Sequence, residues 1–186
     1  RRLSFDTIEH NFYVQHFQTA LDAKNERYRK NRHRDRCQTI DEYRRSATGC
    51  PEQTLYYIGS KADGYPDYNV LLDVYKEFLQ WETEAFPQRV VLNWALHQDE
   101  DGAPHVEEHS VWIGHDRDGN EVVGQGKALE EMGIQAPDPG KKTGKYNNPK
   151  MTFTRMQREK MIELCQKRGL DIERTPREMS RSGKEL

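Results

Sequence analysis

The chain has 186 residues, of which 34% are hydrophobic and 32% charged, and its formal net charge is -2. With a mean hydropathy of -1.08, this composition predicts one domain with solvated helix or tail attached, and no apolar run is long enough to form a membrane-spanning helix. Cys37, Cys50 and Cys165 have no paired ligand spacing, so we expect free thiols and a cytoplasmic protein without a membrane partner.

The first half of the chain predicts two helices separated by a short strand. Residues 8–36 are expected to form a helix with a ragged apolar stripe and basic side chains toward its C-terminal end. A β-rich run follows at 54–58 and is closed by Gly59. Residues 66–86 form the clearest predicted helix, in which apolar residues recur at helical spacing until Pro87 ends it.

Residues 89–97 and 105–113 are expected to pair as antiparallel strands, with a short third strand after the turn at 118–120. In the first strand, alternation predicts one face that packs in the core and one that meets a ligand. The predicted core face carries Val90, Leu92, Trp94 and Leu96, and the predicted ligand face carries Val91, Asn93, Ala95 and His97.

Two further helices are predicted at 127–132 and 151–168. The order of elements is typical of an α+β fold, with an antiparallel sheet, helices packed on one of its faces and a long basic N-terminal helix. We expect a basic helical segment at 1–46, a metal-binding α+β domain at 47–175 and a flexible tail at 176–186.

Basic residues gather in two stretches, although the total charge is close to zero. Residues 24–36 hold seven Lys and Arg side chains against two acids, and residues 141–150 hold four Lys side chains and no acid. Such patches attract polyanions, although a solvated helix face remains the alternative for either one. The candidate contacts to a polyanion such as DNA are Lys30, Arg32, Arg34, Arg36, Lys141, Lys142, Lys145 and Lys150.

Four of the seven histidines fall between residues 97 and 115. Side chains two apart on a strand share a face, so His105, Glu107 and His109 project the same way, and a turn at 101–102 brings His97 to meet them. Imidazoles and a carboxylate with open positions are typical of a catalytic metal site. The sequence therefore predicts a divalent metal at these four residues, against the alternative of a polar hairpin with surface histidines.

The pattern His97-x-Asp99-Glu100, followed by Pro104-His105-x-Glu107, resembles the metal motif of the MobV-type (Pre/Mob) plasmid mobilisation relaxases. These belong to the HUH endonucleases. Residues 25–43 also resemble the basic helix that precedes the sheet in that family, and residues 144–153 resemble a segment that follows the metal motif in some members. The resemblance covers roughly residues 15–175, in the same order along the chain.

The resemblance implies a ferredoxin-like palm, a Mn²⁺ or Mg²⁺ cofactor, and nicking of one DNA strand at a plasmid or mobile-element transfer origin. The enzyme would stay attached to the 5′ end of the cut strand. The implied partners are single-stranded or origin DNA and accessory mobilisation proteins. Glu100 is a candidate catalytic residue beside the metal, where it would complete the ligand shell or hold a ligand imidazole.

The chain departs from the family pattern at two places. Glu107 stands where the family has the second histidine of its His-x-His pair, a change that favours harder metals, and His109 would substitute if the strand is bulged. The nucleophile of the family lies in an N-terminal His-Asn-x-Arg motif, of which residues 10–13 match only the first two letters. We therefore expect the nucleophile upstream of Arg1, with Tyr146 as the candidate inside the chain.

Two other functions remain open from the sequence. One is a DNA-binding module on the same fold that has lost nicking. The other is a metal-dependent phosphodiesterase of unrelated ancestry, in which an activated water attacks the phosphate in place of a side chain. A covalent protein–DNA adduct would distinguish a relaxase from both.

Overall fold

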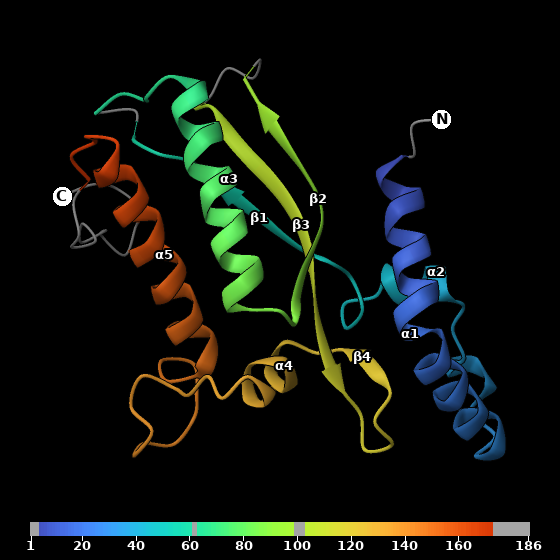
Figure 1. Cartoon of the computed structure of the whole chain (residues 1–186). Coiled ribbons are helices and arrows are strands. Elements are labelled where there is room, and N and C mark those ends of the chain that lie inside the picture. Colours follow the sequence, from blue (N-terminus) through green and yellow to red (C-terminus); the bar gives the residue numbers. More distant parts are fainter. Residues whose placement is uncertain (1–3, 61–62, 99–102, 173–186) are drawn as a thin grey trace, which may run out of the picture.

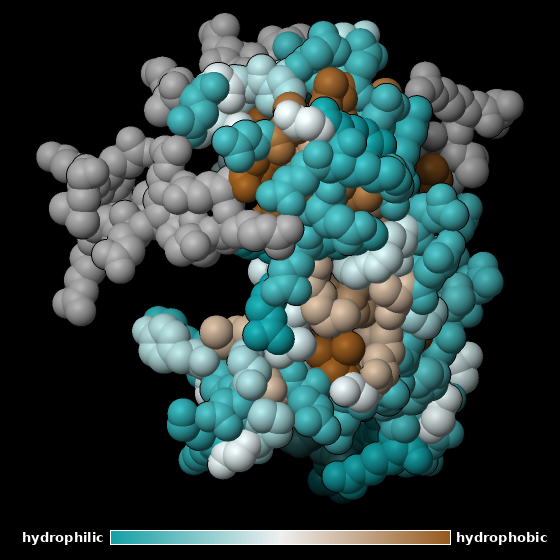
Figure 2. All heavy atoms as spheres, turned by 60° about the vertical axis from the view of Figure 1, so that its left-hand side comes forward, coloured by the Kyte–Doolittle hydropathy of each residue, from teal (hydrophilic) through white to brown (hydrophobic). Residues whose placement is uncertain are grey.

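The computed structural model describes residues 4–60, 63–98 and 103–172, and it confirms the predicted α+β class (Figure 1). The expected tail at 176–186 lies outside these ranges. The surface seen in Figure 2 is mainly hydrophilic, with smaller areas of apolar side chains. Within the described ranges, none of the helices combines the length and the apolar character that crossing a membrane requires.

The elements agree closely with the predicted order. They are α1 (Phe5–Lys30), the 3₁₀ helix η1 (Arg34–Arg36), α2 (Ile40–Arg44), β1 (Glu52–Tyr56), α3 (Tyr68–Ala85), β2 (Arg89–His97), β3 (His105–His115), β4 (Glu121–Val123), α4 (Gln125–Glu131) and α5 (Pro149–Lys167). The expected helix at 8–36 is too long. It ends at Lys30 because Arg32 adopts a left-handed backbone with φ of 61°, which reverses the chain before η1.

Strand β3 is the centre of the antiparallel sheet. It pairs with β1 on one side and β2 on the other, and its last residues pair with β4. Glu107 lies opposite Leu55 of β1 and Ala95 of β2, so three strands meet at its position. Helix α3 connects β1 to β2 across the sheet, and β3 runs antiparallel to both strands between them (Figure 1).

Helices cover both faces of the sheet: α3 and α5 pack on one face, as expected, and the N-terminal α1 packs with α2 on the other. We call the two sides the α3 face and the α1 face. On the α3 face, side chains such as Val106 and Trp112 pack against α3 and α5. On the α1 face, Val111 and Ile113 are buried against Tyr13 and other apolar residues of α1 and α2. The N-terminal helix is therefore part of the core.

A β-bulge in β2 overturns the predicted alternation of that strand. Val91 lies opposite Ser110 and Asn93 lies opposite His109, so Leu92 is the extra residue of the bulge. Before the bulge, Val90 and Leu92 pack on the α1 face; after it, Trp94 and Leu96 pack on the α3 face. The four residues predicted to share one core face are thus divided between two. Val91 leaves the predicted ligand face, since it lies opposite the buried Ser110.

A buried ion network joins three elements on the α3 face. Arg89 of β2 donates to Glu82 of α3 at 2.7 Å and to Glu108 of β3 at 2.8 Å, and all three side chains are at most 1% exposed. Tyr75 donates to Glu108 at 2.6 Å, and Gln157 of α5 donates to Glu82 at 2.5 Å. Burial opposes the charge of Arg89, but the two carboxylates outweigh it and raise its pKa.

Two buried carboxylates share one guanidinium in this network, so one of them carries the excess negative charge. Burial raises the pKa of Glu82 from 4.5 to about 7, which means that folding favours its neutral form. Its stabilising contribution is complete below its unfolded-state pKa of 4.5 and is lost as the pH rises through about 7.

We predict that Glu82→Gln flattens the pH dependence of stability in this range. For the wild type, the group should lower the free energy of unfolding by up to about 3 kcal/mol between these two pKa values, at 1.36 kcal/mol per unit. Urea unfolding at a series of pH values measures the slope, with the exposed Glu84→Gln on the same helix as the control. Equal slopes in Glu82→Gln and wild type would contradict the prediction.

Candidate functional site

Polar side chains gather on the part of the α1 face that lies beyond the buried apolar cluster. His97 Nε2 of β2 lies 3.4 Å from Glu107 Oε2, and His109 Nε2 lies 3.6 Å from Glu107 Oε1. These three side chains are 30%, 32% and 33% exposed. His105 stacks on His97 with ring centroids 5.2 Å apart. The structure therefore brings together the four residues that the sequence predicts as metal ligands.

Two of the histidines are held by their Nδ1 atoms. His105 Nδ1 lies 2.9 Å from the carbonyl oxygen of Ala103, and His109 Nδ1 lies 2.8 Å from Glu9 Oε1. A carbonyl or an ionised carboxylate accepts hydrogen bonds only, so each Nδ1 is the donor. In the neutral rings, Nε2 then carries the lone pair, as in histidines whose other nitrogen is held in place for metal binding.

Glu9 is a residue of the site that the sequence analysis missed. It lies on α1, about 100 residues before its partner His109, and its side chain is 12% exposed. Asn93 Nδ2 also donates to Glu9 Oε1 at 3.1 Å, since the bulge turns Asn93 toward α1. No local spacing signals this contact. An acidic residue near the start of a helix interacts favourably with the helix dipole in any protein. The sequence therefore does not distinguish Glu9 as a residue of the site.

The histidine–Glu107 distances are longer than those between ligands of one hard cation. Adjacent ligands on an octahedral Mn²⁺ or Mg²⁺ lie about 3 Å apart when their bonds are close to 2.1 Å. The two histidine–Glu107 distances are 3.4 and 3.6 Å, and they involve different oxygens. Among the residues that the structure describes, no group of three or more His, Cys, Asp or Glu side chains is arranged to hold a metal. Glu100, the remaining predicted participant, lies outside those residues.

Gln53 links the third strand to this site. Its side-chain nitrogen donates to Glu107 Oε1 from β1. Glu107 is thus contacted from both neighbouring strands, by Gln53 on one side and by His97 on the other. These contacts hold the carboxylate of Glu107 over the middle of the sheet.

The predicted DNA contacts lie far from the histidines. Lys30, Arg32, Arg34 and Arg36 are exposed at the C-terminal end of α1 and in η1. Along α1, Lys30 lies about 30 Å from Glu9 at 1.5 Å per helical residue. The lysines at 141–150 lie in the loop before α5 and at its start, on the other side of the molecule (Figure 1). The structure does not bring the two stretches together as the walls of one groove.

Tyr146 belongs to this second basic loop. It is 80% exposed, and Lys145 lies over its ring at 5.2 Å. The nearby Lys150 pairs with Glu52 at the start of β1, whereas His97 and His105 lie at the other end of the sheet (Figure 1). Tyr146 is therefore not placed beside the histidine cluster.

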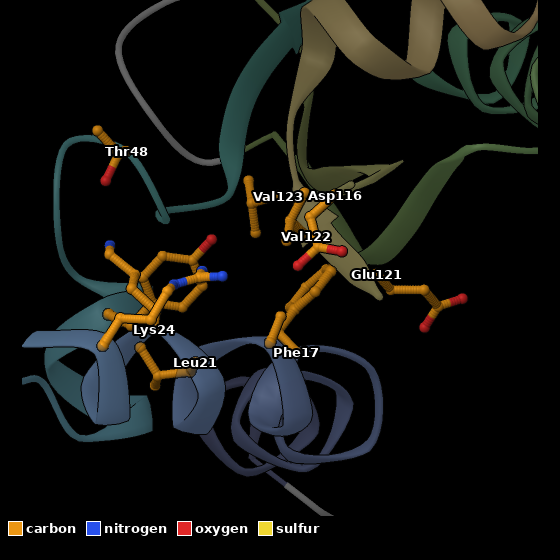
Figure 3. A pocket seen from close by; sticks show the side chains of 11 residues that line it. Phe17, Leu21, Lys24, Thr48, Asp116, Glu121, Val122 and Val123 are labelled. Carbon is orange, nitrogen blue, oxygen red and sulfur yellow. The ribbon is translucent and has the colours of Figure 1, made fainter. Parts of the chain in front are cut away.

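A cavity of about 310 Å³ lies between α1 and the β4 region, next to the first basic stretch. In Figure 3, Phe17, Leu21 and Lys24 approach it from α1, and Val122 and Val123 approach it from β4. Arg27 adds a second cation, but Asp116 and Glu121 also line the cavity. The charges of this lining are balanced, so it does not select for an anion.

Only exposed aromatic side chains can stack on the bases of a bound nucleic acid. Trp94 is only partly exposed, since its ring packs 5.2 Å from that of the buried Tyr75. Tyr146 and Tyr57 are 80% and 63% exposed. Tyr57 directly follows β1, the strand that carries Gln53. Trp94 thus belongs to the core, whereas the two tyrosines present their rings to solvent.

We predict that Trp94→Ala lowers the free energy of unfolding by about 3 kcal/mol, because it leaves a cavity against α3. Tyr146→Ala, the matched control, should change it by less than about 0.5 kcal/mol. Midpoints of urea unfolding provide both values. A similar loss for the two variants would show that Trp94 does not support the core.

The chain was compared with protein-family models, curated proteins and solved structures. No family model, curated protein or solved structure matches the chain. The resemblance to MobV-type relaxases accordingly rests on the residues quoted from the sequence. The function that follows is a proposal built on those residues and on their geometry.

Proposed function

We propose that the chain forms the metal-binding part of a relaxase domain that nicks single-stranded DNA at the transfer origin of a plasmid or other mobile element. The observation that carries the proposal is the convergence of His97, Glu107 and His109 on one partly exposed face of the sheet. His105 lies against the same group through its stacked ring. His97, His105 and Glu107 belong to the motif on which the resemblance depends, and His109 lies two residues beyond it.

The chemical types of these side chains suit a hard divalent cation, although in the described residues they are not arranged to hold one. Glu107 offers carboxylate oxygens, which Mn²⁺ and Mg²⁺ prefer, and His105 and His109 offer Nε2 lone pairs in their neutral forms because their Nδ1 atoms are donors. A bound cation would polarise the scissile phosphate and offset the charge that develops on the leaving oxygen. Gln53 and the backbone carbonyl of Ala103 orient Glu107 and His105, so the protein would supply prearranged ligands.

The sheet topology is compatible with a ferredoxin-like palm. Strands β1 and β2 are joined through α3 and flank β3, which is the split βαβ arrangement found in the β-α-β-β-α-β unit. Helix α5 then packs beside α3 on the same face. Strand β4 departs from that unit because it pairs with the end of β3.

The basic stretches would contact the DNA backbone away from the cut. Three of these lysines pair with carboxylates. Lys30 Nζ lies 3.0 Å from a carboxylate oxygen and Lys141 Nζ lies 2.8 Å from another, and Lys150 also forms an ion pair. Surface pairs of this kind contribute little to stability, so phosphates can replace the carboxylates at small cost. Contacts of this type position a strand without reading its sequence.

Metal binding gives the first test. We predict one Mn²⁺ site per chain, and Glu107→Ala should weaken it more than about 100-fold, the upper end of what supporting residues contribute. The control is His115→Ala, which changes another β3 histidine that pairs with Glu131 instead. Isothermal titration calorimetry measures both. Equal affinity of Glu107→Ala and wild type would exclude this site.

Strand transfer gives the second test. The resemblance places the nucleophile before the basic helix, so the assay uses the chain with whatever sequence its gene encodes before Arg1. End-labelled single-stranded origin DNA is incubated with Mn²⁺ and resolved on a denaturing gel. We expect a cut strand and a protein–DNA adduct that Glu107→Ala loses and Tyr146→Phe keeps, because the nearby Lys150 pairs with Glu52 at the other end of the sheet from His97 and His105.

The other outcomes would contradict either the proposed strand transfer or the expected upstream nucleophile. Cutting without an adduct would indicate a phosphodiesterase that uses water. DNA binding without any cutting would indicate a binding module. An adduct that disappears in Tyr146→Phe would make Tyr146 the nucleophile and would show that the loop before α5 reaches the metal.

A further inference from the structure

We infer that Glu9 is a positioning residue, which fixes the His109 imidazole in the tautomer that turns its Nε2 lone pair toward Glu107. The inference concerns the ring orientation of His109 in the metal-free protein. Its use for metal binding rests on the proposed function. Neither the sequence pattern of the metal motif nor the resemblance includes a residue of α1 in this role.

The hydrogen-bond geometry carries the argument. Glu9 Oε1 lies 2.8 Å from His109 Nδ1, within the range of a charge-assisted hydrogen bond. The carboxylate has no proton to donate when ionised, so Nδ1 bears the hydrogen. The other ring nitrogen, Nε2, is 3.6 Å from Glu107 Oε1, on the opposite side of the ring from α1. The neutral ring therefore presents an acceptor to the site.

The position of Glu9 is itself fixed from two sides. Asn93 Nδ2 donates to the same Oε1 atom at 3.1 Å, and Arg44 Nη1 lies 3.6 Å from Oε2. The Arg44 side chain is 5% exposed and also donates to Asp41 at 2.7 Å and to Asp6. Helix α2, through Arg44, thus anchors the carboxylate that anchors His109.

A purely structural role for Glu9 would be to attach α1 to the sheet. In that case its loss would lower stability without changing the tautomer of a folded His109. The two roles can therefore be separated by a measurement on the imidazole nitrogens. Long-range ¹H–¹⁵N NMR distinguishes a protonated from an unprotonated ring nitrogen, and His109→Gln assigns the signals.

The test begins with the wild-type chain, free of metal and DNA, at a pH about 2 units above the ordinary histidine pKa of about 6.5. We expect His109 with Nδ1 protonated and Nε2 unprotonated. Finding the proton on Nε2 would overturn the inference at once, whatever the variants do. This measurement does not depend on how well any variant folds.

Glu9→Ala should then remove the preference for this tautomer, whereas Glu26→Ala, an exposed glutamate on the same helix that pairs with Lys30, should keep it. Glu9→Gln should restore it, because the amide oxygen also accepts a hydrogen bond. If Glu9→Ala keeps the wild-type tautomer in a folded chain, the inference is wrong. Circular dichroism establishes that each variant is folded.

Mn²⁺ titration connects the inference to the proposed function. Loss of an outer partner of a ligating histidine typically costs about 10–100-fold in affinity, so we expect a loss in that range for Glu9→Ala and none for Glu26→Ala. If the wild type shows the expected tautomer but binds no Mn²⁺, the proposed function fails and the positioning of His109 by Glu9 stands. If Mn²⁺ binds with equal affinity to Glu9→Ala, the positioning role fails and the metal site stands.

Discussion

The burial of Arg89 between two carboxylates is the constraint on which the sheet depends. A guanidinium that is 1% exposed is tolerated only when its charge is paired, and Glu82 of α3 and Glu108 of β3 pair with its Nη1 and Nη2 atoms, whereas its buried Nε has no hydrogen-bond partner. These contacts fix the end of α3 against β2 and β3, with Gln157 of α5 joined to the same group. Breaking the network by removing one partner would leave an unpaired buried charge, so the elements on the α3 face keep one arrangement.

That constraint also determines which acid of β3 reaches the candidate site. Glu107 and Glu108 are neighbours, and a strand sends neighbours to opposite faces. Glu108 is fully buried beside Arg89, so Glu107 must project onto the α1 face between His97 and His109. The bulge in β2 also contributes to the candidate site. It lets the strand bury Leu92 against α1 and then turn Asn93 toward Glu9.

Local sequence patterns predicted the elements well, because helix and strand periods are local properties. The strand expected at 89–97 has the bounds of β2, and the shared face of His105, Glu107 and His109 follows from simple alternation. The pattern could not reveal the bulge, since Val90, Leu92, Trp94 and Leu96 alternate without interruption in the sequence. Glu9 and Arg89 escaped notice for a different reason. Their partners are set by tertiary packing, which no spacing along the chain encodes.

Helix α1 carries acidic side chains in its N-terminal part and basic side chains in its last turn. Its N-terminal part supplies Asp6 and Glu9, and its last turn supplies Arg27, Arg29 and Lys30, an order that the helix dipole alone would favour. The helix dipole alone is therefore enough to explain the basic residues in the last turn of α1, without any contact to DNA. The acidic end needs more explanation, since Glu9 is nearly buried and is bound by Arg44, Asn93 and His109 together. A carboxylate that only served the helix dipole would lie in solvent. The burial of Glu9 makes α1 part of the candidate site as well as part of the core.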